Sequence, residues 1–276
     1  MTTKPDRYAV MGNPVSHSKS PQIHSLFAAQ TAQHLEYQAI LVTPGGFATA
    51  VNAFRATGGR GLNVTVPFKQ DAWIYADVLT SRSERAGAVN TLAFRDNGEV
   101  LGENTDGLGL VRDLCGNHGA KLKGKRILLL GAGGAARGIL QPLLVQQPAS
   151  LVIANRTPVK AAELALLFSD LGRVSGLSFP ELQGRSFDLI INATATGLDD
   201  TVPPLPAGVL GEGGWCYDLM YGVNPTAFVR WGHAHGAARS LDGLGMLVEQ
   251  AAESFYLWRG VRPDTVAVLQ ALRKRY

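Results

Sequence analysis

The 276-residue sequence has little cysteine, no apolar run of membrane length and no clustered metal ligands. Cys115 and Cys216 are far apart and outside any metal-binding spacing, which excludes a disulfide framework and favours free thiols in a reducing cytoplasm. The N-terminus lacks the apolar core of a signal peptide, and the six histidines form neither HxH nor HExxH. These absences predict a cytoplasmic protein with no membrane partner and no metal.

Charged residues are also scarce, at 17%, and they leave a net charge of only +4. No long basic stripe interleaves with aromatic residues, so nucleic acid is not an expected partner. The weak positive balance instead favours a small anionic ligand. Hydrophobic residues make up 46% of the chain, which at this length predicts two modest domains with substantial cores.

Apolar strands alternate with helical segments along the second half of the chain. The strand candidates are "KRILLLG", "SLVIA", "FDLIIN" and "GGWCYDL", and helix-like periods follow the first two. Such continuous apolar strands predict a parallel sheet that is covered on both faces. The first hundred residues predict a second α/β unit, in which "VNTLAF" and "VLGEN" form a hairpin around "RDNGE".

A glycine-rich turn follows the first of these apolar runs. The pattern G-x-G-x-x-A occupies residues 131–136, between a predicted strand and a predicted helix. Glycine permits a tight turn and close approach of the backbone, and a helix N-terminus attracts pyrophosphate. A glycine turn without a ligand is the alternative, but the strand–turn–helix setting favours dinucleotide binding. The predicted contacts are Gly131, Ala132, Gly133, Gly134 and Ala135.

The second predicted strand of this half ends in Asn155, Arg156 and Thr157, with no acidic residue. Folds specific for NAD place an acid here to bind the ribose hydroxyls, whereas a guanidinium binds phosphate in a planar fork. Lys160, one turn later, adds positive charge. In the alternative interpretation Thr157 caps the next helix, Pro158 is its first residue and Arg156 is merely solvated. The turn favours NADP as the cofactor.

Hydroxyl groups are concentrated in "NPVSHSKSP", residues 13–21. Ser20 followed by Pro21 predicts a helix start with Ser20 as its N-cap. Ser18 has no such structural explanation. Two hydroxyl groups beside a helix N-terminus suit a small carboxylate, which the exposed N–H groups also attract.

The stretch "NVTVPFK", residues 63–69, places Asn63 and Thr65 on one face of a predicted strand. Lys69 falls in the first turn of the next helix, where a cation opposes the helix dipole and does not serve helix stability. A solvated surface lysine is the alternative, but the position also suits proton transfer.

Two further polar residues have both a structural and a functional interpretation. Asp106, in "GENTDG", is either a helix N-cap or a carboxylate of the site, and Asn90 is either a turn residue or a ligand. With the residues above they place hydroxyl, amide, ammonium and carboxylate groups at strand ends, where open α/β sheets bind ligands.

The chain resembles the shikimate dehydrogenase family in eight blocks, in order along nearly its whole length: "GNPVSHSKSP", "NVTVPFK", "AGAVNT", "ENTDG", "GAGGAA", "NRT", "INAT" and "DGLGMLVEQA". The resemblance implies an NADP-dependent enzyme that interconverts 3-dehydroshikimate and shikimate in aromatic amino-acid biosynthesis. It implies Lys69 and Asp106 as the catalytic pair. The implied substrate contacts are Ser18, Ser20, Asn63, Thr65, Asn90, Tyr221 and Gln250, and the implied cofactor contacts also include Thr194, Leu219 and Gly243.

The resemblance also implies that the chain returns to its first domain after "DGLGML". We therefore expect two α/β domains with a cleft between them. One is an N-terminal substrate domain of residues 1–106 plus 244–276, and the other is a Rossmann-type parallel-sheet dinucleotide-binding domain of residues 107–243. Ala136 and Ala195 stand where relatives often carry serine, and both concern cofactor contacts only.

Two alternative functions remain open. A quinate/shikimate dehydrogenase that uses NAD or NADP acts on a substrate differing by one ring hydroxyl and by ring saturation, which sequence does not separate. A non-catalytic NADP-binding sensor would not need Lys69 and Asp106 together. A small-molecule substrate and a monomer or homodimer are expected, and the sequence does not decide between these two assemblies.

Overall fold

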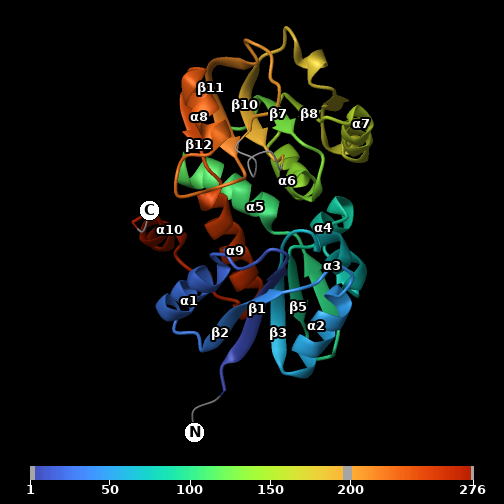
Figure 1. Cartoon of the computed structure of the whole chain (residues 1–276), viewed down its shortest axis with the longest axis vertical. Coiled ribbons are helices and arrows are strands. Elements are labelled where there is room, and N and C mark those ends of the chain that lie inside the picture. The colour runs from blue at the N-terminus through green and yellow to red at the C-terminus, as the bar shows by residue number, and fades with distance from the viewer. Residues whose placement is uncertain (1–3, 195–200, 275–276) are drawn as a thin grey trace. The chain divides into compact units, whose positions relative to one another are not determined.

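The structure, a computed structural model, describes residues 4–194 and 201–274, and it divides into two compact units (Figure 1). The first unit contains the described residues up to Gly109 together with those from Val248 onward, and the second contains Leu110–Leu247. In the part of the chain that is described, no helix is both long and apolar enough to cross a bilayer.

The first unit is built on a mixed sheet in the order β2-β1-β3-β5-β6-β4. β1 pairs in parallel with both β2 and β3, whereas β5 is antiparallel to β3 and β6. The predicted hairpin of β5 and β6 is thereby confirmed. The strands are β1 (Asp6–Gly12), β2 (Leu35–Leu41), β3 (Gly59–Val64), β4 (Val78–Leu79), β5 (Thr91–Phe94) and β6 (Val100–Glu103).

Helices cover both faces of this sheet. Phe47 and Phe54 of one helix and Ala72 of another pack against Ala9 and the other core residues of one face. On the other face Trp258 stacks on Tyr8 of β1, with ring centroids 4.6 Å apart. The helices are α1 (Ser20–Gln30), α2 (Phe47–Ala56), α3 (Lys69–Tyr75), α4 (Ser81–Ala86), the part of α9 (Leu244–Arg259) from Val248, and α10 (Thr265–Arg273).

The second unit is a wholly parallel sheet in the order β12-β11-β10-β7-β8-β9. Leu128 and Leu130 of β7 pack into one hydrophobic cluster and Leu129 into another, so both faces are buried as the apolar runs predicted. The strands are β7 (Arg126–Leu130), β8 (Ser150–Ala154), β9 (Val174–Leu177), β10 (Phe187–Asn192), β11 (Leu210–Asp218) and β12 (Arg239–Leu241).

This strand order is the doubly wound order of dinucleotide-binding folds, in which the carboxyl ends of the strands form the ligand edge. Of the helices of this unit, those after β7 and β8 were predicted and the one after β11 was not. The helices are α6 (Gly134–Val145), α7 (Pro158–Leu167) and α8 (Ala227–Ala234), with short helical turns at Arg112–Asn117, Ser169–Leu171 and Pro180–Leu182. The short helix α5 (Asp106–Val111) precedes them.

Candidate active site

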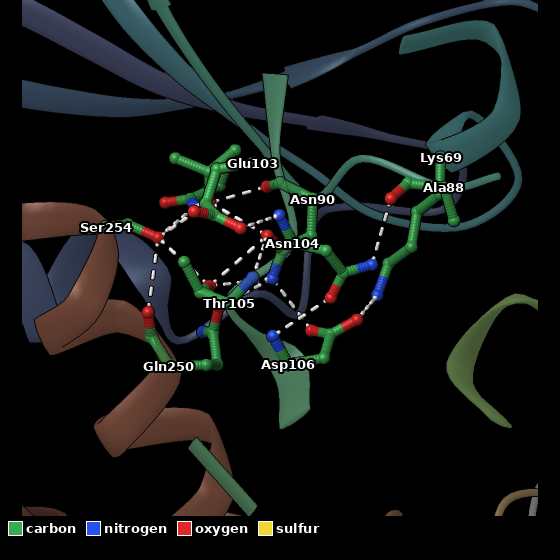
Figure 2. A network of polar contacts seen from close by, with 11 residues as sticks. Lys69, Ala88, Asn90, Glu103, Asn104, Thr105, Asp106, Gln250 and Ser254 are labelled. Atoms are coloured by element: carbon green, nitrogen blue, oxygen red, sulfur yellow. Dashed lines mark hydrogen bonds and ion pairs between the residues drawn. The ribbon is translucent and has the colours of Figure 1, made fainter. Parts of the chain in front are cut away.

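An ion pair between Lys69 and Asp106, two residues of the first unit, lies where two helices begin (Figure 2). Lys69 is the first residue of α3 and Asp106 the first of α5, and the lysine Nζ contacts the Asp106 Oδ2. The side chains are only 18% and 9% exposed. Because little water screens the pair, it is held more firmly than a surface ion pair would be.

Asn90 fixes the other oxygen of this carboxylate. The backbone N–H of Thr105 donates to Asn90 Oδ1 at 2.9 Å, and a backbone N–H can only donate. The amide is thereby oriented with its Nδ2 toward Asp106 Oδ1, to which it donates at 2.8 Å. One oxygen of Asp106 therefore faces an ammonium and the other faces an amide, which leaves the carboxylate little rotational freedom (Figure 2).

Asn104, rather than Asp106, provides the side-chain acceptor at the start of α5. Its Oδ1 accepts the backbone N–H of Asp106 at 3.1 Å, and its Nδ2 donates to Ala88 O at 3.0 Å. The structural interpretation of Asp106 as a helix N-cap is therefore wrong. Asp106 is itself the first residue of α5, so its carboxylate does not cap the first-turn N–H groups and instead contacts Lys69.

Asn63 and Gln250 join the same buried network. Asn63 Oδ1 accepts the Tyr37 hydroxyl at 2.7 Å, and Asn63 Nδ2 donates to Ser254 Oγ at 2.9 Å. Gln250 Oε1 accepts from Asn90 Nδ2 at 3.2 Å. The structure thus brings together five predicted site residues within the first unit: Lys69, Asp106, Asn90, Asn63 and Gln250.

The serine-rich stretch folds differently from its predicted capping. Helix α1 begins at Ser20 with Lys19 in the cap position, and Ser18 Oγ accepts the Ser20 N–H at 3.2 Å. Ser20 is therefore not the N-cap: as a helical residue it cannot fold its hydroxyl back onto the first-turn N–H groups. Ser20 is buried and hydrogen-bonds Tyr37, whereas Ser18 remains partly exposed.

Thr65 and Tyr221 are the two remaining predicted substrate residues outside the serine-rich stretch. β3 ends at Val64, so Thr65 follows the strand and its N–H donates to Met11 O at 2.9 Å. The prediction that Thr65 belongs to the strand was wrong by one residue. Tyr221 lies in the second unit, after β11, and is partly buried.

Several residues around this network were not predicted from the sequence, among them Tyr37, His24, Thr91 and Ser254. Tyr37 stacks on the fully buried His24, with ring centroids 4.2 Å apart, and burial raises the pKa of Tyr37 well above its usual value although Ser20 opposes this. The hydroxyls of Thr91 and Ser254 lie 2.7 Å apart. Ser254 follows Gln250 by four residues, and this i, i+4 spacing on one helix face was a usable signal.

In the second unit, the glycine turn after β7 has the open backbone that a diphosphate needs. Gly131 has φ +102°, and a Cβ there would lie 3.0 Å from Ala193 O. Gly133 and Gly134 are exposed with no atom near the position of a Cβ, and α6 starts at Gly134 without a side-chain cap. The partly exposed Ala132 and Ala135 flank these glycines, so the first N–H groups of α6 remain open to a ligand.

The turn after β8 carries exposed positive charge. Arg156 and Lys160 are both exposed, and neither has an acidic partner among the described residues. Asn155 Nδ2 donates to Thr157 O at 3.0 Å, and Thr157 occupies the cap position of α7 without a side-chain cap hydrogen bond. Thr157 is therefore at the N-cap and Pro158 is the first helical residue, as the alternative interpretation held, but the Thr157 hydroxyl makes no capping hydrogen bond. The turn still suits a phosphate group.

The remaining predicted cofactor residues meet at the carboxyl ends of β10 and β11. Thr194 Oγ1 donates to Asn192 Oδ1 at 2.6 Å, and the Gly243 N–H donates to Met220 O at 2.9 Å. A Cβ on Gly243 would lie 2.2 Å from Leu219 O, so only glycine fits this approach. Ala195 lies outside the described residues.

Comparison with known proteins places the sequence among enzymes of one kind. Residues 10–92 match the shikimate dehydrogenase substrate binding domain, residues 113–198 match shikimate / quinate 5-dehydrogenase, and residues 243–273 match the shikimate 5'-dehydrogenase C-terminal domain. The chain is 56% identical to the shikimate dehydrogenase (NADP(+)) of Nitrosococcus oceani, covering 98% of this chain and 96% of that protein. It is 58% identical to that of Methylococcus capsulatus, with 98% and 97% covered.

Solved structures are also similar to this chain over nearly its full length. An Ael1 enzyme from Pseudomonas putida superposes with a TM-score of 0.91 at 50% identity, covering 97% of this chain and 98% of that chain. Shikimate 5-dehydrogenase from Thermus thermophilus, solved in complex with NADP(H) and shikimate, superposes with a TM-score of 0.86 at 34% identity, covering 98% and 100%.

Proposed function

Since the chain belongs to the shikimate dehydrogenase family, we propose that it catalyses the reversible NADPH-dependent reduction of 3-dehydroshikimate to shikimate in aromatic amino-acid biosynthesis. The observation that carries the proposal is the buried Lys69–Asp106 ion pair, which Asn90 holds in one orientation. A family member without this pair would retain the fold but lose the proton-transfer group.

Lys69 acts on the oxygen of the substrate carbonyl. Its ammonium stabilises the negative charge that develops there during reduction and donates a proton to it, and in the reverse direction Lys69 accepts that proton. Asp106 keeps Lys69 oriented, while Asn90 prevents the carboxylate from turning away. NADPH, when bound, supplies the hydride to the carbonyl carbon.

Substrate recognition is assigned to the first unit. The proposed ligands of the ring hydroxyls are Asn63, Asn90, Asp106 and Gln250, whose amide and carboxylate groups already converge. Ser18, Ser20 and Thr65 are proposed to bind the substrate carboxylate, because hydroxyls beside the start of α1 suit an anion. The role of Tyr221 stays a prediction.

Cofactor binding is assigned to the second unit. Gly131, Gly133 and Gly134 would admit the diphosphate against the start of α6. Arg156 and Lys160, with Asn155 and Thr157 beside them, would bind the 2′-phosphate that distinguishes NADP from NAD. A cytoplasmic location and a monomeric or homodimeric state complete the proposal.

Initial rates of nicotinamide reduction test the proposal, measured with shikimate or quinate and with NADP⁺ or NAD⁺ in all four pairings. We expect the shikimate–NADP⁺ pairing to dominate, because Arg156 and Lys160 favour the 2′-phosphate. Comparable turnover of quinate or a preference for NAD⁺ would instead assign the chain to a broader quinate/shikimate specificity. Folded protein with no measurable rate in any of the four pairings would favour the non-catalytic sensor.

A further inference from the structure

Three of the predicted cofactor segments are joined by backbone hydrogen bonds in the second unit. The Leu219 N–H donates to Asn192 O at 2.9 Å, which ties the end of β11 to the end of β10. The Gly243 N–H donates to Met220 O at 2.9 Å, which adds the segment after β12. Thr194, Leu219 and Gly243 therefore lie on one continuous, hydrogen-bonded edge.

The carboxylate of Asp218 accepts hydrogen bonds from several residues of this edge. Asp218 is the last residue of β11 and has no exposed surface. Its Oδ1 accepts Asn192 Nδ2 and the Met220 N–H, both at 3.1 Å, and its Oδ2 accepts the Thr226 hydroxyl at 2.6 Å. Because Met220 and Thr226 lie at the two ends of the loop between β11 and α8, Asp218 fixes both ends of that loop.

Asp218 also determines how Asn192 is oriented. A carboxylate can only accept, so Asn192 must turn its Nδ2 toward Asp218. Asn192 Oδ1 then faces the opposite way and accepts both the backbone N–H of Thr194 at 3.2 Å and its hydroxyl at 2.6 Å. Asp218 therefore acts on Thr194 through one intervening amide.

Burial of the Asp218 carboxylate does not by itself stabilise the fold. Asp218 has no cationic partner among the described residues, and burial raises the pKa of its carboxyl group, with Asp242 adding a charge of the same sign. Burying a carboxylate that has hydrogen-bond donors but no cation costs free energy. A positional role for the carboxylate accounts for its retention here.

In doubly wound sheets the two halves of the sheet each bind one mononucleotide half of a dinucleotide. The β7–β9 half carries the glycine turn and Arg156, which suit the adenosine half, and the β10–β12 half remains for the nicotinamide half. We propose that Asp218 is a positioning residue for the nicotinamide half of NADP(H), acting through Asn192 on Thr194 and through Met220 on Leu219. The inference rests on the proposed function of the second unit.

The test compares two ligands by titration calorimetry: NADP⁺, and 2′-phospho-ADP-ribose, which is NADP⁺ without the nicotinamide ring. In D218N the side-chain NH₂ group replaces one carboxylate oxygen, and because it can only donate, it faces a donor that a carboxylate oxygen accepts in the unsubstituted protein. We expect the Kd of NADP⁺ to rise about tenfold, in line with the loss of hydrogen bonds to a charged group. The Kd of 2′-phospho-ADP-ribose should stay unchanged, because the β7–β9 half is intact.

D188N is the matched control, since Asp188 lies at the opposite end of β10 and pairs with Arg126. N192A is the second variant, and it should show the same ligand pattern even where D218N fails to fold. Equal losses for both ligands, or no loss for either, would overturn the proposal and leave Asp218 a structural residue. Failure of the unsubstituted protein to bind 2′-phospho-ADP-ribose would instead overturn the NADP site itself.

Discussion

Among single residues, Lys69 has the most sharply defined chemical role, because no other ammonium group contacts Asp106 among the described residues. We expect Lys69→Ala to lower kcat by about 10²–10⁴-fold, the usual contribution of a positioned proton donor. The KM for shikimate should change little, since Asn63, Asn90 and Gln250 remain in place. Steady-state kinetics with Lys123→Ala, an exposed lysine outside the site, provide the control.

A large rise in KM with kcat intact would contradict this role and assign Lys69 to substrate binding alone. Lys69 was recognisable by its position, because a lysine in a first helical turn does not stabilise the helix, and its pairing with Asp106 followed from the family resemblance. The details around the pair were not predictable. Ser20 and Asp106 each suit an N-cap position. Because both helices start one residue earlier than expected, each is instead the first helical residue and its side chain does not cap the helix.

Buried hydrogen-bond partners are harder still to predict at this scale. Tyr37 and Ser254 contact Asn63 from positions 26 residues before it and 191 residues after it, and apart from the spacing of Ser254 from Gln250 no local pattern marks them. Their contribution depends on which side of the sheet each helix covers. Local sequence carries no such information.

At the scale of elements, the contact between β3 and α9 holds α9 on the first sheet. A Cβ on Gly61 would lie 2.5 Å from Trp258 Nε1 and 2.9 Å from Leu92 O, to which that Nε1 donates at 3.0 Å. We expect Gly61→Ala to lower the free energy of unfolding by about 1–3 kcal/mol through overpacking, measured by urea denaturation.

Gly116→Ala is the matched control, because no atom lies within 4 Å of its Cβ position and its φ is not positive. Equal stability of the two variants would show that α9 yields to the added methyl group and is not held tightly. Four strands of the second unit were predicted, since β7, β8, β10 and the buried end of β11 are apolar, whereas the short strands β9 and β12 were not. β4 has two residues and α4 is the polar segment "SRSERA", so neither offers a hydrophobic period.

At the scale of the whole molecule, sequence order alone suggests two consecutive domains, because a glycine-rich break separates two α/β patterns. The apolar face of α9 does not specify which sheet it covers. The described residues from Val248 onward belong to the first unit, where Phe255 packs against Phe27 and Trp258 against Tyr8. Such long-range pairings follow from packing, which the periodicity of one helix leaves open.

The pH dependence of global stability tests this packing through His24. Burial lowers the pKa of His24 from 6.5 to about 3, with Asn63 opposing the shift. Below pH 6.5 the unfolded chain binds a proton at this histidine and the folded chain does not, so the free energy of unfolding falls as the pH falls toward 3. Between pH 7.5 and pH 5.0 this loss amounts to about 2 kcal/mol.

His24→Phe should remove that loss, because phenylalanine keeps the stack on Tyr37 and has no proton to bind. Asp218 contributes with the opposite sign, since its pKa is raised, and its contribution cancels in the difference between variant and parent. Urea denaturation at both pH values measures that difference, with a substitution of the exposed His34 as control. Parallel pH profiles of parent and His24→Phe would mean that His24 titrates normally, and that the helices covering this face of the sheet admit water to its ring.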